Sequence, residues 1–123
     1  MHIEKIAQLI KENHCDAVIL LNESNMHYAC GFSPSEGVAV ITAGGDGYHI
    51  VDSRYTETAI CHSKKTGLSV IEINSTFADE VKKIADKHGI KRILFENETI
   101  SFMQYEKYTQ LLTDTEFIPL DNQ

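Results

Sequence analysis

The sequence predicts an α/β domain in three layers, with a mixed β-sheet covered by helices on both faces. Apolar runs typical of buried strands alternate along the chain with segments whose apolar residues recur at helical spacing. One pair of predicted strands is joined by a glycine-rich turn typical of a hairpin. The 123 residues fit one domain with a substantial hydrophobic core, so we expect a single domain over residues 1–123.

The expected helices and strands follow from the periodicity of apolar residues and from the positions of turn residues. We expect, in chain order, helix 3–14, strand 17–21, short helix 26–30, loop 32–37, strands 38–42 and 48–51, helix 54–62, strand 68–73, helix 77–88, strand 90–95, a helix from 102, and strand 116–120. Apolar residues from Ile3 to Ile10 lie on one helical face, and the continuous apolar run at 17–21 is typical of a strand buried on both sides. Gly31 would end the short helix in a left-handed conformation.

The segment Ala43-Gly44-Gly45-Asp46-Gly47 lies between two apolar strands and predicts an antiparallel hairpin. Three glycines in five residues would also suit a phosphate-binding loop. Such loops lead into the first turn of a helix, however, and here a strand follows. We therefore favour the hairpin.

The junction after the second hairpin strand places Asp52, Ser53, Arg54 and Tyr55 between a strand and a charged helix. The first amides of a helix lack intrahelical partners, so the Asp52 carboxylate can accept hydrogen bonds from them. We expect Asp52 to cap, Arg54 to pair with a nearby carboxylate and Tyr55 to pack. A functional role for these side chains is the alternative.

Capping residues delimit the later helices. Ser75 or Thr76 begins the helix that buries Phe77, Val81, Ile84 and Ala85, and Gly89 ends it. Ser101 and Gln104 have the spacing of a capping box, which starts a helix carrying Phe102, Tyr105 and Leu112.

Composition disfavours several partners. The chain has 11 Lys and Arg against 18 Asp and Glu, a net charge of −7, and no basic run, so binding to nucleic acid is not expected. No apolar run approaches the ~20 residues of a membrane span, and charges near Met1 do not suit a secretory signal. We expect a cytoplasmic protein that does not bind a membrane.

The residues form no self-sufficient catalytic site, and we predict no catalytic residue and no metal ligand in this chain. None of the six histidines stands at a metal-ligand spacing with a carboxylate, and Cys15, Cys30 and Cys61 are too widely spaced for a zinc site. Cys30 with His27 lacks an orienting carboxylate for nucleophilic catalysis. Glu96 and Glu98 follow a strand and could form an acid and base pair, but we favour a solvated acidic loop.

Several short motifs, taken together, resemble those of a known protein family. In chain order they are Asn25, Tyr28, Gly31-Phe32, the strand Gly37-Val38-Ala39-Val40-Ile41, Asp52-x-Arg54-Tyr55, Phe95-Glu96 and Tyr105. The sequence resembles the amino-terminal domain of the creatinase and prolidase family, most closely that of an Xaa-Pro dipeptidase or Xaa-Pro aminopeptidase. The resemblance spans nearly everything from Ile3 to Leu120.

The resemblance implies that a complete enzyme continues into a carboxy-terminal peptidase domain of pita-bread fold. There, Asp, His and Glu ligands would hold two divalent metal ions, manganese or cobalt, and we expect no cofactor in the present segment. The sequence stops about where the family's interdomain linker would begin, which suggests an excised, inactive domain of a metal-dependent hydrolase. The alternatives are a free-standing binding module of the same fold and a small hydrolase using Glu96, Glu98 or Cys30.

In family members this domain builds a homodimer and lends residues to the rim of the neighbouring subunit's active site. The matching positions here, which we call the rim residues, are His27, Tyr28, Phe32, Ser33, Pro34, Ser35 and Glu36. Pro34 would stiffen a loop behind Gly31, and we expect it to narrow the cleft in favour of short proline-containing peptides. The loop lacks the aromatic residue and arginine with which creatinase-like enzymes hold creatine, so an Xaa-Pro peptidase is the better parent.

Overall fold

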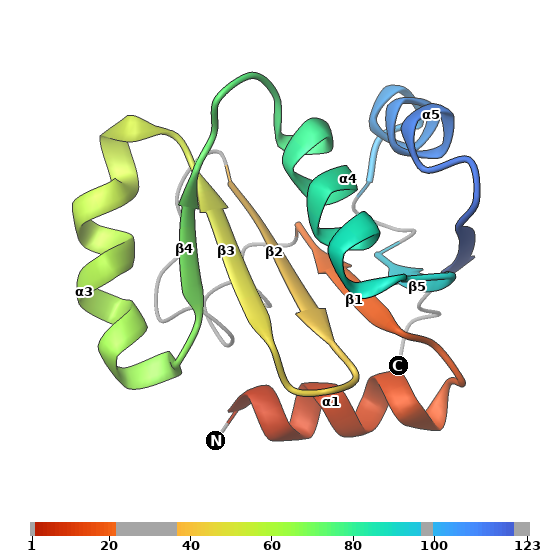
Figure 1. The fold of residues 1–123 in the computed structure, drawn as a ribbon, viewed down its shortest axis with the longest axis horizontal. Coiled ribbons are helices and arrows are strands. Elements are labelled where there is room, and N and C mark those ends of the chain that lie inside the picture. Colours follow the sequence, from red (N-terminus) through yellow and green to blue (C-terminus); the bar gives the residue numbers. More distant parts are fainter. Residues whose placement is uncertain (1, 22–36, 97–99, 120–123) are drawn as a thin grey trace.

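A computed structural model of the chain describes residues 2–21, 37–96 and 100–119. The elements are α1 His2–Glu12, β1 Ala17–Leu20, β2 Gly37–Thr42, β3 Gly47–Val51, the 3-10 turn η1 Ser53–Tyr55, α3 Thr56–Thr66, β4 Ser69–Glu72, α4 Phe77–His88, β5 Arg92–Phe95, α5 Phe102–Leu111 and β6 Glu116–Pro119. From β3 to β6, strands and helices alternate along the chain, as the sequence predicted (Figure 1). The short helix expected at 26–30 lies outside the described residues.

The strands form one mixed sheet in the order β4-β3-β2-β1-β5-β6. β2 is antiparallel to β1 and β3, which confirms the predicted hairpin, whereas the pairs β1 with β5, β3 with β4, and β5 with β6 are parallel. Every strand except β2 therefore points the same way. The carboxyl ends of five strands and the start of β2 meet at one end of the sheet, the upper end in Figure 1, which we call the carboxyl end.

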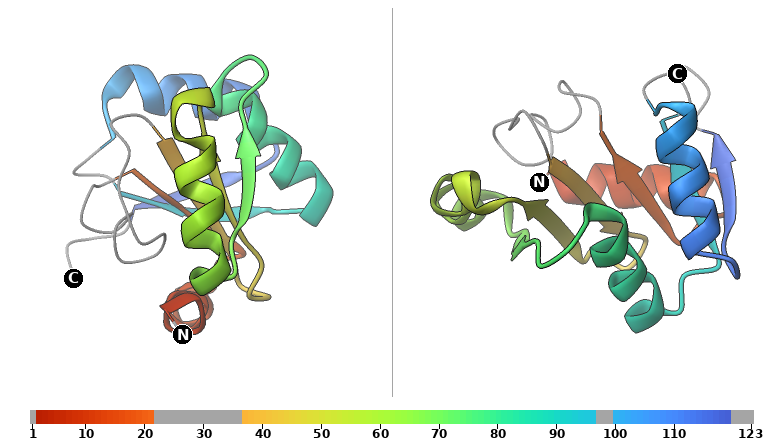
Figure 2. Two further views of the ribbon diagram at one scale, coloured as in Figure 1. Left: turned by 90° about the vertical axis from the view of Figure 1, so that its left-hand side faces the viewer. Right: turned by 90° about the horizontal axis from the view of Figure 1, so that it is seen from above.

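Two hydrophobic clusters cover the two faces of the sheet, which confirms the three-layer α/β architecture. On one face, α1 buries Ile3, Ile6 and Ile10 against side chains of β1 and β2. On the other face, α4 and α5 bury a cluster that contains Val81 and Tyr108. The right-hand view of Figure 2 shows α1 and α4 on opposite sides of the sheet, and α3 packs beside β4 at one edge.

The capping residues act as the sequence predicted. Thr76 accepts a hydrogen bond from the Asp79 amide, and Gly89 ends α4 with φ of +62°. Ser101 and Gln104 form both hydrogen bonds of a capping box at the start of α5. These signals are local in sequence, which is why they can be recognised without tertiary structure.

Two helices differ from expectation in detail. The helix expected from Arg54 to His62 begins with the separate turn η1 and continues to Thr66, because Gly67 supplies the left-handed end at φ of +80°. On α5, Tyr108 is the buried residue, whereas Phe102 is 74% exposed. Tyr105 packs against Phe95 with ring centroids 5.3 Å apart.

Candidate functional site at the carboxyl end of the sheet

The predicted rim residues lie between two described positions at the carboxyl end of the sheet. Leu21 follows β1, and Gly37 begins the antiparallel strand β2, so the chain leaves and re-enters the sheet at this end. The rim residues themselves, with Gly31, lie outside the described residues. The structure therefore fixes where the segment is attached, and the roles of its side chains stay predictions.

Glu96 joins the ends of β1 and β5 at this site. The residue is 5% exposed, and its carboxylate accepts a hydrogen bond from the backbone amide of Leu21, 75 positions earlier in the chain. Its carbonyl oxygen accepts from the Ile100 amide at 2.9 Å. The expectation of a solvated acidic loop is wrong for Glu96, because the parallel pairing of β1 with β5 brings a backbone donor to its carboxylate. Glu98 lies outside the described residues.

The Asp52 junction at the end of β3 has the capping geometry that the sequence predicted. Asp52 Oδ1 accepts from the Arg54 amide at 2.9 Å, and Asp52 Oδ2 accepts from Arg54 Nη2 at 2.8 Å. These hydrogen bonds from Arg54 and its charge hold the pKa of Asp52 below its ordinary value. The Arg54 guanidinium carbon lies 5.2 Å from the centre of the Tyr55 ring. The contacts fix the turn that leads into α3.

A polar cluster that the sequence analysis missed lies at the opposite end of the sheet. The Tyr48 hydroxyl and His88 Nε2 are 2.7 Å apart, and His88 Nδ1 lies 3.9 Å from a carboxylate oxygen of Asp46. These contacts fasten the β2–β3 hairpin to the last turn of α4. The sequence placed His88 correctly near a helix end, but its partners are about 40 residues away in the chain.

His49 is buried in β3, within the strand that the sequence predicted at 48–51. It is 2% exposed, and its partner in the register is Ala39, which belongs to the cluster under α1. Burial, with a smaller contribution from the charge of His62, lowers the pKa of His49 to about 4. This histidine therefore stays neutral at ordinary pH.

Metal and thiol chemistry receive no support from the described part of the chain. Within it, no group of three His, Cys, Asp or Glu side chains is arranged to hold a metal ion. Cys15 is buried and Cys61 exposed, and both are free thiols, while burial raises the pKa of Cys15. Cys30 and His27, the alternative nucleophile pair, lie outside the described residues. None of the described helices is long and apolar enough to cross a membrane.

Comparison with known proteins agrees with this arrangement. The domain described as "Creatinase/Prolidase N-terminal domain" matches residues 2–123. The sequence is 31% identical over 120 residues to a Bacillus subtilis protein named "Uncharacterized peptidase YqhT", covering 98% of this chain and 33% of that protein.

Solved structures with the same fold include two Xaa-Pro peptidases. The Xaa-Pro dipeptidase from Bacillus anthracis superposes with a TM-score of 0.85 at 30% identity, over 96% of this chain and 32% of that one. The X-Pro aminopeptidase from Thermotoga maritima gives a TM-score of 0.81 at 28% identity, over 95% of this chain and 33% of that one. An N-terminal domain of the cytoplasmic peptidase PepQ from Mycobacterium tuberculosis shares the fold, with a TM-score of 0.84 at 21% identity.

The present chain spans about a third of the length of its longer relatives. The match extends over nearly every residue, from the first helix to the last strand, and it includes the strand order that creates the carboxyl end. This chain belongs to the creatinase/prolidase N-terminal domain family.

Proposed function

We propose that this domain is the non-catalytic, amino-terminal part of a cytoplasmic Xaa-Pro peptidase, in which it supports a homodimer and shapes entry to the active site. The observation that carries the proposal is the 30% identity to an Xaa-Pro dipeptidase over 96% of this chain. In such an enzyme the hydrolysis of the bond before proline belongs to the peptidase domain, where the resemblance also places both metal ions. The residues of the present domain contribute shape and contacts.

The sheet gives the proposed rim a rigid base. Leu20 and Ala39, close to the two attachment points, are both buried, and they pair with each other across β1 and β2. The Glu96 carboxylate then holds the first amide after β1. A loop whose two ends are fixed this way loses less entropy when it meets a substrate, which suits a rim that sorts peptides by length.

The first experiment compares two proteins in the hydrolysis of Xaa-Pro dipeptides with added manganese or cobalt. One is the 123-residue chain, and the other is the product of the complete reading frame. We expect hydrolysis only by the longer product. Hydrolysis by the 123 residues alone would contradict the proposal and direct attention to Glu96, Glu98 and Cys30. A longer product that binds proline peptides without cleaving them would favour a binding module.

The second experiment tests the rim directly. In the longer product, Ser33→Ala, Ser35→Ala and Glu36→Ala are combined, and kcat/KM is measured for Xaa-Pro peptides of two lengths. We expect the ratio of the short-peptide to the long-peptide value to fall, because the removed side chains no longer narrow the cleft. The matched control carries Ser63→Ala and Glu57→Ala, substitutions of the same kinds on α3. An unchanged ratio in the rim variant would refute the gating role.

A further inference from the structure

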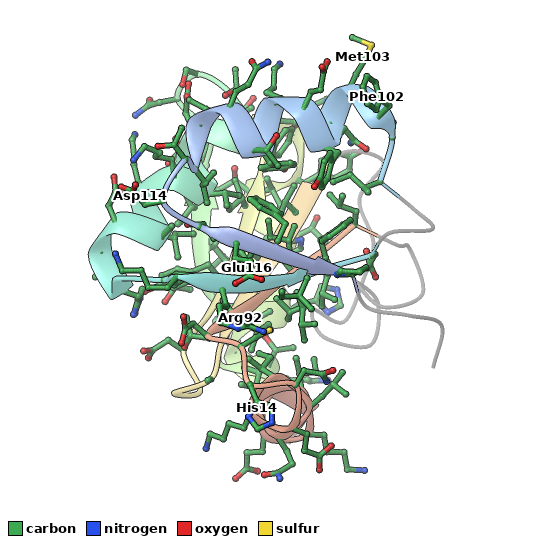
Figure 3. The ribbon with its side chains drawn as sticks, turned by 90° about the vertical axis from the view of Figure 1, so that its right-hand side faces the viewer. His14, Arg92, Phe102, Met103, Asp114 and Glu116 are labelled. Carbon is green, nitrogen blue, oxygen red and sulfur yellow. The ribbon has the colours of Figure 1, made fainter. Side chains whose placement is uncertain are left out.

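The first turn of α5 presents two large apolar side chains to solvent. Phe102 is 74% exposed and Met103 is 79% exposed, and Figure 3 shows both projecting from the helix away from the sheet. The capping box at Ser101 fixes this turn, so the two side chains are held in place on a formed helix. We call Phe102 and Met103 the α5 patch.

The α5 patch lies at the same end of the sheet as the point at which the described chain leaves it. β5 and β6 are parallel, and Phe95 is paired with Pro119 at their ends. The Ile100 amide donates to the Glu96 carbonyl at 2.9 Å, which links the end of β5 to the start of α5. Tyr105 then packs on Phe117 of β6 with ring centroids 6.0 Å apart. The start of α5 and the end of β6 therefore share the carboxyl end of the sheet.

The longer relatives have more chain beyond the equivalent of this exit. This chain matches an amino-terminal domain and covers 32% to 33% of those proteins, so most of their length follows the equivalent of β6. We propose that the α5 patch is a docking contact for a peptidase domain on the carboxy-terminal side of this one, as the proposed function requires. This inference rests on the proposed function and names the surface through which the two domains touch.

The small size of the α5 patch favours a tethered partner over a second copy of this chain. A stable interface between separate proteins buries roughly 800 Å² on each partner, far more than two side chains supply. A domain joined to β6 by a short linker meets the patch at a high effective concentration, so a small apolar contact is sufficient to hold it. Covering the patch also removes apolar surface from water.

Hydroxyl-radical labelling read by mass spectrometry tests the inference without measuring activity. The 123-residue chain and the product of the complete reading frame are labelled under the same conditions. We expect labelling of Phe102 and Met103 to fall at least fivefold in the longer product. Ile60 on α3 is the matched control, because it is 47% exposed and lies at the opposite edge of the sheet, so its labelling should stay the same.

A pair of variants adds a second measurement. Phe102→Ser combined with Met103→Ser should leave the thermal midpoint of the 123-residue chain within about 2 °C, because both side chains are exposed there. In the longer product the same change should make the two domains unfold at different temperatures, whereas Ile60→Ser should not. A loss of stability in the 123-residue chain equal to that in the longer product would mean that the patch serves only this domain, and would overturn the inference.

Three further outcomes would also overturn it. These are equal labelling of the α5 patch in both proteins, protection that appears in the 123-residue chain alone as its concentration rises, and a reading frame that ends at residue 123. The experiments distinguish a failure of this inference from a failure of the proposed function. An active longer product with a fully labelled patch would refute only the docking contact, and a protected patch on an inactive product would refute only the peptidase assignment.

Discussion

Lowering the pH from 7 to 5 should destabilise this domain through one buried histidine. His49 is 2% exposed, and burial together with the nearby His62 lowers its pKa from 6.5 to about 4. Between these two values the unfolded chain binds a proton at His49 and the folded chain does not. Since the unfolded state then binds more protons, stability falls as the pH falls. The contribution is complete above about pH 7 and is lost as the pH approaches 4.

The size of the effect follows from the two pKa values. Each unit of difference corresponds to about 1.4 kcal/mol, so the full contribution of His49 is about 3 kcal/mol. At pH 5 the unfolded histidine is almost fully protonated, and the folded one remains largely neutral. The loss between pH 7 and pH 5 is therefore about 2 kcal/mol. Asp52 and Asp79, whose pKa values are lowered, lose their contributions only at more acidic pH.

Urea unfolding of the wild type and of His49→Gln at pH 7 and pH 5 measures this contribution. Glutamine does not titrate, so we expect the variant to lose about 2 kcal/mol less than the wild type between the two pH values. The substitution itself also lowers the free energy of unfolding, but by the same amount at both pH values, so this amount cancels in the comparison. His14→Asn is the control, because His14 is exposed, and asparagine also accepts its left-handed φ of 58°. A pH-dependent loss in His49→Gln equal to that of the wild type would refute the reasoning.

Urea unfolding also tests three other contacts. Glu96→Ala removes the buried acceptor of the amide that follows β1 and should cost about 2 kcal/mol, with Glu96→Gln costing less; equal costs would contradict a role for the acceptor. Gly47→Ala would place a Cβ that clashes with Leu68 Cδ2 and should cost ~1–3 kcal/mol, whereas Gly44→Ala, whose Cβ would meet only Thr42 Oγ1 at an ordinary contact distance of 3.9 Å, should be nearly neutral. Ser101→Ala should cost ~1 kcal/mol, and an unchanged midpoint would contradict the capping role.

The sequence alone was sufficient to predict the features that depend on residues close together in the chain. The capping box at Ser101, the helix end at Gly89 and the turn between β2 and β3 each follow from residues within a few positions of one another. The mixed sheet followed from the alternation of strands and helices. The strand order itself, with β1 between β2 and β5, depends on pairings that no local pattern encodes.

The features that sequence reasoning missed depend on distant partners. The polar residues that follow β5 are typical of a solvated loop. The Glu96 carboxylate is nevertheless a buried acceptor, because the amide of Leu21, 75 positions away, donates to it. His88 meets Tyr48 across 40 positions. The exposure of Phe102 could not be predicted from periodicity, because it depends on where α5 sits relative to α4 and the sheet edge.

The sheet topology explains why the proposed functional features gather at one end. A single antiparallel strand, β2, lets the segment between β1 and β2 leave and return at the carboxyl end, where all the other strands finish. In open α/β sheets that end is also where ligands commonly bind. The buried Glu96 fixes the departure of the rim segment, and β6 delivers the chain to the same end of the sheet. A domain that follows β6 would thus start close to the segment proposed to shape substrate entry, without any rearrangement of the sheet.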